Sequence, residues 1–183
     1  MITGEMLRIC DISIVLPLKL IFCSILQTGK YPTVWKQANV TPAFKKNNKQ
    51  SLNNYRPISL LPLCGKIFEK IVFEQLYSYL NNNDPITRNQ SGFRPGDSTT
   101  NQLVFLTNEI HECFEHKNSI EVRAFFSDIS KAFDKVWRDG FLFKLKQNGI
   151  HGNLLSLLKS YLHNRHQRVV LDGFCFEYTE VEA

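Results

Sequence analysis

The sequence lacks the signatures of several simple protein classes. Its five cysteines are odd in number and include no C-x-x-C pair, so neither a disulfide framework nor a zinc site is indicated, and we expect reduced, buried thiols. No internal repeat or low-complexity tract is visible. With 183 residues, of which 43% are hydrophobic and 21% charged, the chain is expected to fold around a core rather than to be disordered or fibrous.

The sequence also has no long uninterrupted apolar run. The apolar stretch 12–26 follows Asp11 and contains Pro17 and Lys19, so we expect it to be too short and too broken to cross a bilayer. No small-residue cleavage site follows it, which argues against a signal peptide. Its apolar spacing predicts a core helix that Gly29 ends, and no membrane partner is expected.

Acidic residues are absent from one long segment. Between Lys30 and Lys66 the chain has seven basic residues and no Asp or Glu, whereas the whole chain has a net charge of +5. The remainder therefore has two more acidic than basic side chains. This concentration predicts a surface for phosphate groups, and a solvated basic loop is the alternative interpretation.

The pattern of strand-forming and helix-forming residues predicts a mixed α and β organisation. The basic segment contains a strand at 35–44, a polar loop at 45–54 and an extended segment at 55–57, because a proline disfavours helix in the residue before it. Further helices are predicted at 65–80, 98–117 (capped by Ser98), 141–147 and 153–162, and a hairpin at 167–178 with its turn at Asp172-Gly173.

One junction combines a strand pattern with a carboxylate. Residues 122–127 predict a short strand that ends at Asp128, and helical spacing resumes at 130–134. Taken alone, Asp128 is equally well explained as a helix N-cap. A carboxylate at a strand end is also a good Mg²⁺ ligand, and a separate basic loop can neutralise a triphosphate. Both halves of a phosphoryl-transfer site are thus indicated.

Four segments carry a resemblance to a known family. They are WKQANVTPAFKK (35–46), NYRPISL (54–60), SGFRPG with Ser98 and Thr99 (91–99), and FSDISKAFDKV (126–136). In this order and at these separations they resemble the reverse transcriptase domain of non-long-terminal-repeat retrotransposons, the jockey-like and LINE-like elements. The resemblance covers nearly the whole chain.

The resemblance implies an α+β fold, the fingers and part of the palm of a right-hand polymerase. Residues 1–120 would form the fingers and adjoining helices, and 121–183 the start of the palm. The family's glycine-rich and double-aspartate palm motifs do not occur in the sequence, so we expect a fragment, from a truncated gene model or a decayed element copy. The expected fold is therefore a partial reverse transcriptase domain.

The resemblance also implies roles for residues near the predicted strand end. Asp128 matches the first palm aspartate, which binds the catalytic metals, and the carbonyl of Ile129 would be a second metal contact. Phe133 matches the bulky side chain that excludes a 2′-hydroxyl, with a core aromatic as the alternative. The backbone amides of Lys131 and Ala132 would face the triphosphate at a helix N-terminus.

Nucleotide and template contacts follow from the other matching segments. Arg56 matches the fingers arginine that binds nucleotide phosphates, and Lys45 or Lys46 matches the fingers lysine, with the register left open. The template-binding candidates are Gly92, Phe93 and Arg94, although a structural turn explains the glycine nearly as well.

The function implied is that of an RNA-directed DNA polymerase fragment. Such an enzyme transfers deoxynucleotides (dNTPs) to a primer 3′-hydroxyl by two-metal catalysis with Mg²⁺, using an RNA template and a DNA primer. With one of the three carboxylates, we expect negligible activity from this chain alone. The alternative is a non-catalytic nucleic-acid-binding remnant of a decayed element. The family resemblance further implies cytoplasmic and nuclear localisation.

Overall fold

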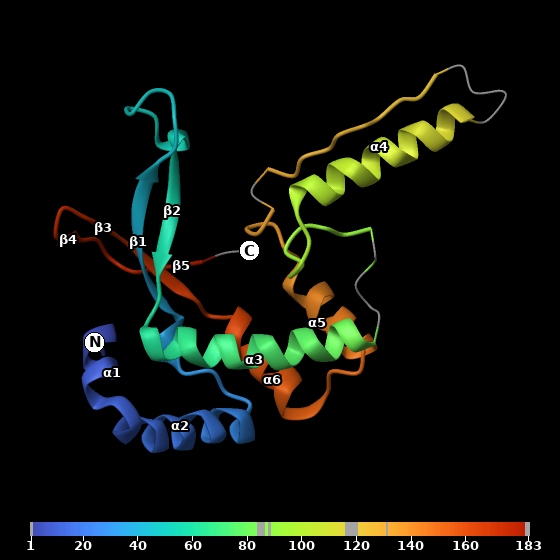
Figure 1. The fold of residues 1–183 in the computed structure, drawn as a ribbon. Coiled ribbons are helices and arrows are strands. Elements are labelled where there is room, and N and C mark those ends of the chain that lie inside the picture. The colour runs from blue at the N-terminus through green and yellow to red at the C-terminus, as the bar shows by residue number, and fades with distance from the viewer. Residues whose placement is uncertain (1, 84–86, 88, 116–120, 131, 182–183) are drawn as a thin grey trace. The chain divides into compact units, whose positions relative to one another are not determined.

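A computed structural model describes residues 2–83, 87, 89–115, 121–130 and 132–181. The chain forms two compact units, one of residues 1–77 and 133–183 and the other of residues 78–132 (Figure 1). Their mixture of helices and sheet confirms the expected α+β class.

The first unit contains a five-stranded sheet with the order β2-β1-β3-β4, and with β5 paired to β3. Its strands are β1 (Gln37–Phe44), β2 (Tyr55–Leu60), β3 (His166–Leu171), β4 (Phe174–Cys175) and β5 (Thr179–Glu180). β1 is antiparallel to β2 and parallel to β3. The strand predicted at 35–44, which begins at Gln37, the extended segment at 55–57 and the hairpin predicted within 167–178 are thus confirmed. The second hairpin turns at Asp172 and Gly173, whose φ angles of 50° and 84° suit a tight turn of this kind.

Helices surround the base of this sheet. The α-helices of the first unit are α1 (Gly4–Cys10), α2 (Val15–Thr28), α3 (Leu63–Asn82, which runs on into the second unit), α5 (Arg138–Gln147) and α6 (Gly152–Leu162). Short 3-10 helices cover Asp11–Ile14 (η1), Thr33–Lys36 (η2) and Leu52–Asn54 (η3). Gly29 ends α2 as predicted: it has a φ of 63°, and its N–H donates to Ile25 O at 3.0 Å.

The core of the first unit is an aromatic cluster between α2, α3 and α6, which lie together at the base of the β1–β2 hairpin (Figure 1). Its centre is Phe68 of α3, which is only 2% exposed. The ring of Phe68 lies 5.2 Å from that of Phe22, 6.3 Å from Tyr31 and 6.1 Å from Trp35, measured between centroids. These rings join α2 and α3 to the segment that leads into β1, and α6 adds Leu157 to the cluster and a Tyr161 ring 5.1 Å from that of Tyr31.

The N-terminal segment differs from its prediction. Of the described residues in 12–26, Ile25 is buried and Phe22 packs against the core, whereas most of the others are exposed, so the expectation of a core helix holds for one face of α2 only. Pro17 does not break the helix, because α2 restarts at Val15 and a proline in a first turn needs no hydrogen bond from its nitrogen. By length and composition alone, the helical stretch Gly4–Thr28 is long and apolar enough to cross a membrane, so the expectation that it is too short and too broken is wrong, although many core helices and signal sequences are equally apolar.

The cysteines are free, but most of them are not buried. Cys64 on α3 is buried, whereas Cys10, Cys23, Cys113 and Cys175 are exposed. The prediction of buried thiols is therefore wrong at four of the five positions, because these four lie at helix and strand positions that other residues do not cover.

The second unit contains α4 (Thr99–Glu115), which begins as predicted. Ser98 Oγ accepts a hydrogen bond from the Asn101 N–H at 3.1 Å and so caps the helix. The predicted strand at 122–127 is wrong: the described segment 121–129 is irregular. No described strand pairs with it, and an extended segment without a neighbour leaves its backbone groups to water. Accordingly Phe125 and Phe126 are 92% and 84% exposed.

Candidate functional site

The β1–β2 hairpin projects beyond the rest of the sheet (Figure 1). Two prolines limit the pairing of its projecting part with other strands. Pro42 faces Pro57 in the hairpin register. Neither residue has an N–H, so the pair occupies a position where antiparallel neighbours exchange no hydrogen bonds and both backbones point outward. The ladder between β1 and β3 ends at Val40, just before Pro42. Each outer edge of the hairpin therefore lacks an N–H donor at its proline, and a further strand cannot pair with the hairpin there.

Lys45 and Arg56 lie on one face of this hairpin. Arg56 pairs with Ala43, and the Lys45 N–H donates to Asn54 O at 2.8 Å, which extends the register by one further pair. Side chains alternate along a strand, and directly opposed residues share a face. Lys45 and Arg56 are therefore diagonal neighbours, about 7–8 Å apart at this spacing. Both side chains are exposed.

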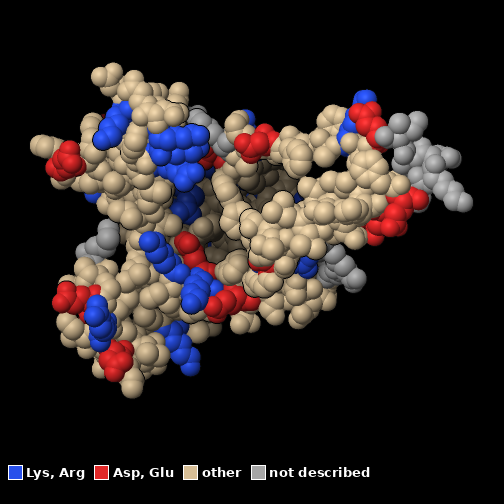
Figure 2. Space-filling view, turned by 45° about the horizontal axis from the view of Figure 1, so that its top comes forward, with Lys and Arg blue, Asp and Glu red and all other residues tan. Residues whose placement is uncertain are grey.

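The opposite face of the hairpin is aromatic and fixes its tip. The rings of Phe44 and Tyr55 lie 5.5 Å apart, and Lys49 Nζ lies 5.6 Å from the Phe44 ring. The Tyr55 hydroxyl donates to Lys49 O at 2.9 Å, and Asn54 Nδ2 donates to Asn48 O at 2.8 Å. Figure 2 shows Lys and Arg side chains gathered over this hairpin. The tip of the basic segment is thus ordered by contacts within the hairpin, and its lysines are exposed.

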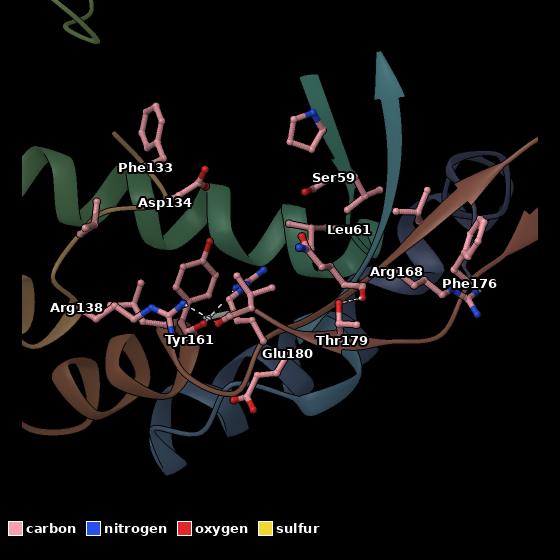
Figure 3. Close-up of a pocket in the computed structure, with 18 of the residues that line it drawn as sticks. Ser59, Leu61, Phe133, Asp134, Arg138, Tyr161, Arg168, Phe176, Thr179 and Glu180 are labelled. Atoms are coloured by element: carbon pink, nitrogen blue, oxygen red, sulfur yellow. Dashed lines mark hydrogen bonds between the residues drawn. The ribbon is translucent and has the colours of Figure 1, made fainter. Parts of the chain in front are cut away.

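An open groove of about 1200 Å³ lies in the first unit, beside the sheet (Figure 3). Phe133 and Asp134 line it, together with residues of β2, α6 and β3. Phe133 is 80% exposed, so its alternative interpretation as a core aromatic is wrong. Lys45, Lys46 and Arg56 are not among the described lining residues, because Pro57 and Ser59 of the other hairpin face border the groove.

The residues predicted around Asp128 do not have the local structure expected. Asp128 and Ile129 are exposed in the irregular segment of the second unit. The helix predicted at 130–134 is wrong, because the described residues there form turns and α5 begins only at Arg138. Ala132 is therefore not at a helix N-terminus, and Lys131 lies outside the described residues. Asp128 and Arg56 belong to different units.

The template candidates form an exposed turn in the second unit. Phe93 is exposed and has a φ of 60°, so Phe93 rather than Gly92 takes the left-handed conformation in this turn. Arg94 is held by the carbonyl of Thr87, to which its guanidinium donates at 3.2 Å. A hydrogen bond from the Ser98 N–H, at 2.7 Å, is the main cause of the lowered pKa of Asp97.

The donor set for magnesium is incomplete in the described part of the chain. Among those residues, no three His, Cys, Asp or Glu side chains gather in a way that could hold a metal ion. Asp128 offers one carboxylate, whereas a pair of Mg²⁺ ions needs carboxylate ligands for both metals in addition to phosphate oxygens. These residues alone do not fit a two-metal site.

Sequence reasoning missed a buried polar cluster beneath the groove. Lys36 is 7% exposed, and its Nζ lies 3.4 Å from Ser160 Oγ. Burial and a 2.6 Å hydrogen bond to Glu69 raise the pKa of Tyr31. Strand alternation gave no signal for this burial, because Lys36 ends the 3-10 helix η2 and β1 begins only at Gln37.

Comparison with known proteins identifies the family. The model of the family "Reverse transcriptase (RNA-dependent DNA polymerase)" matches residues 44–181. The chain belongs to the reverse transcriptase family. This reverse transcriptase chain is 37% identical over 158 residues to the RNA-directed DNA polymerase from mobile element jockey of Drosophila melanogaster, covering 86% of this chain and 17% of that protein.

Two further relatives support the same family assignment. The probable RNA-directed DNA polymerase from transposon BS of Drosophila melanogaster is 34% identical over 160 residues, covering 87% of this chain and 17% of that protein. The jockey polymerase of Drosophila funebris is 32% identical over 184 residues, covering 100% of this chain and 20% of that protein. The expected kinship with jockey-like reverse transcriptases is confirmed, and the chain spans about a sixth to a fifth of these relatives' length.

Proposed function

We propose that this chain is the fingers and the start of the palm of an RNA-directed DNA polymerase, with the boundary near residue 120. The proposal rests on one observation: in this member of the reverse transcriptase family, Lys45 and Arg56 lie on the same exposed face of the β1–β2 hairpin. Two cations on one face suit the phosphates of a deoxynucleoside triphosphate. Arginine binds phosphate through two donors and lysine adds a compact charge.

The register favours Lys45 over Lys46 as the partner of Arg56. Lys45 still pairs with Asn54, whereas Lys46 lies in the bend after the last paired residue, so the register places only Lys45 on the face that carries Arg56. Phe133, exposed in the groove, remains the candidate for excluding a ribose 2′-hydroxyl. Gly92, Phe93 and Arg94 remain candidates for the RNA template.

Asp128 and Ile129 are proposed to contribute one carboxylate and one carbonyl to a two-metal Mg²⁺ site. Because the described residues lack a complete donor set, we propose that the 183-residue polypeptide alone extends no primer. Primer extension on a poly(A) template with Mg²⁺ tests this, and incorporation above the enzyme-free background would contradict it.

Binding to a labelled RNA–DNA primer-template, followed by fluorescence anisotropy, tests the proposed function. Arg56→Ala is expected to weaken binding about tenfold, because a charge-assisted phosphate contact contributes about 1.5–3 kcal/mol before exposure to solvent reduces it. The salt dependence should fall by about one phosphate contact. Lys146→Ala, which removes an exposed charge on α5, is the matched control. Equal affinities for the two variants would refute the proposal.

A non-catalytic remnant of a mobile element is the second candidate, favoured by the missing donor set. It predicts RNA binding through the same hairpin without incorporation, even when the family's remaining palm motifs are fused to the chain. Polymerase activity of that fusion would exclude the remnant. Cytoplasmic assembly on RNA followed by nuclear synthesis is proposed for the polymerase alone, on the family resemblance.

A further inference from the structure

A pocket with mainly polar side chains lies wholly within the second unit. Its volume is about 450 Å³, and it lies between the turn at 89–97 and the start of α4. Three residues of α4 line it, namely Asn101, Gln102 and Phe105. Phe105 follows Asn101 by four positions and Gln102 by three, and side chains at these spacings lie on the same side of a helix. Two side-chain amides and one aromatic ring therefore face the turn together.

The ring of Phe105 is open to a ligand. It is 46% exposed, and the ring contacts among the described residues do not include it. Leu103, Val104 and Phe114 of the same helix are also exposed, but they are not among the described residues that line the pocket. An aromatic face beside polar groups suits a flat ligand with hydrogen-bonding groups at its edge, because such a ligand can stack on the ring and keep its polar edge paired.

Hydrogen bonds hold the turn against α4 and orient the Asn101 side chain. Asp97 Oδ1 accepts the Ser98 N–H at 2.7 Å, and the side chains of Ser91 and Asn101 donate to the same carboxylate. These hydrogen bonds, the one from Ser98 first, lower the pKa of Asp97. Because the amide nitrogen of Asn101 donates to Asp97, its amide oxygen remains available as an acceptor. The hydrogen-bonded wall of the pocket is therefore formed without a ligand.

The remaining polar groups of the pocket favour an uncharged ligand. No hydrogen bond among the described residues uses the Gln102 side chain, whose amide offers a donor and an acceptor in one plane. The charged side chains that line the pocket are Arg94 and Asp97, and the charge of Arg94 offsets that of the Asp97 carboxylate. Arg94 also donates to Thr87 O at 3.2 Å, which holds its guanidinium in place. Planar amides beside a ring and a balanced pair of charges suit a neutral heterocycle better than a phosphate.

We propose that this pocket binds one unpaired nucleobase, which stacks on Phe105 and hydrogen-bonds through its edge to the amides of Asn101 and Gln102. Unpaired bases are commonly bound in this way, by an aromatic face and by side chains along the base edge. The inference rests on the proposed function for the source of the base, an RNA template. It goes beyond the template turn at 92–94 because it assigns a base site to α4. A free nucleotide carries the same chemistry and is the second source.

Fluorescence anisotropy with a short labelled oligouridine RNA tests the pocket. The 183-residue chain is expected to bind this RNA about fivefold to tenfold more tightly than an abasic oligomer of equal length and charge, which is the effect of one stacked base. Phe105→Leu should remove most of this preference for bases and leave binding of the abasic oligomer unchanged. Phe105→Trp should retain the preference, because tryptophan also offers a stacking face.

A matched control and a second pocket variant keep the test decisive. Phe114→Leu removes an exposed ring of the same helix outside the pocket and should leave the preference for bases unchanged. Gln102→Ala should weaken binding of the intact RNA about twofold to fivefold, the loss of one hydrogen bond, even if Phe105→Leu fails to fold. Equal binding of the two oligomers by the unaltered chain would overturn the proposal. A full preference in Phe105→Leu, or unaltered RNA affinity in Gln102→Ala, would overturn it as well.

A competition arm distinguishes the two sources of the base. Uridine monophosphate is added in millimolar excess to the RNA complex. Loss of the preference for bases assigns the pocket to a free nucleotide, whereas a preference that persists assigns it to a base of the RNA.

Arg56→Ala separates this inference from the proposed function. A phosphate contact on the hairpin should contribute equally to the intact and the abasic oligomer, so Arg56→Ala should weaken both and leave the preference for bases unchanged. If the hairpin contact fails, the effect of Phe105→Leu remains. If the base pocket fails, the effect of Arg56→Ala remains.

Discussion

Replacing Phe68 by alanine should remove much of the stability of the first unit. Phe68 is 2% exposed and lies among the rings of Phe22, Tyr31 and Trp35, with centroids 5.2 to 6.3 Å away. Truncating a fully buried phenylalanine costs about 3–5 kcal/mol from lost burial and the cavity left behind. For a chain of this size that corresponds to a fall in melting temperature of about 6–20 °C.

Phe73 is a matched control on the same helix. It is 58% exposed and stacks on Tyr77, with ring centroids 5.6 Å apart. Phe73→Ala loses one exposed ring contact, about 0.5–1.5 kcal/mol. Urea unfolding followed by tryptophan fluorescence measures both variants. Equal destabilisation by the two substitutions would show that the aromatic cluster does not hold α2, α3 and α6 together.

Three further perturbations test local features. Gly29→Ala should lower the free energy of unfolding, measured by urea titration, by about 2 kcal/mol. An alanine is strained at a φ of 63°, and its Cβ would lie 2.9 Å from Asn153 O. An unchanged urea midpoint would contradict this prediction. Gly140→Ala should displace the Trp137 ring, whose atoms occupy the space of the new Cβ, and acrylamide quenching of that tryptophan should increase in a variant lacking the other one. The pKa of Asp97, measured by NMR, should lie below its ordinary value of 3.8. The ionised carboxylate should therefore stabilise the fold above the unfolded-state pKa, and this stabilisation should be lost as the pH falls through the lower folded-state pKa. A titration midpoint above 3.8 would be inconsistent with the hydrogen bond from the Ser98 N–H.

Local chemistry in the sequence was sufficient to predict most of the first unit. The Gly29 stop, the Asp172-Gly173 turn and the alternating pattern before and after the basic loop each depend on a few adjacent residues, and each is confirmed. The segment 122–127 has equal strand propensity but no described neighbour to pair with. Strand formation requires a partner that propensity alone does not reveal.

The candidate site was predictable by residue type but not by orientation. The sequence indicated a basic surface and left Lys45 and Lys46 as alternatives. Register information, from Ala43 opposite Arg56 and the Lys45–Asn54 hydrogen bond, was needed to distinguish them. The burial of Lys36 was not foreseen, because lysine is rarely buried and its environment comes from α6, more than a hundred residues away.

Comparing Lys45→Ala with Lys46→Ala tests the proposed hairpin site most directly. The two residues are adjacent, identical in type and both exposed, but only Lys45 continues the strand register, and Lys46 lies in the bend beyond it. Binding of a fluorescent deoxynucleoside triphosphate should weaken about fivefold to tenfold with Lys45→Ala, the loss of one phosphate contact, and less than twofold with Lys46→Ala. The same loss for both variants, or a larger loss with Lys46→Ala, would contradict a phosphate-binding face formed by Lys45 and Arg56.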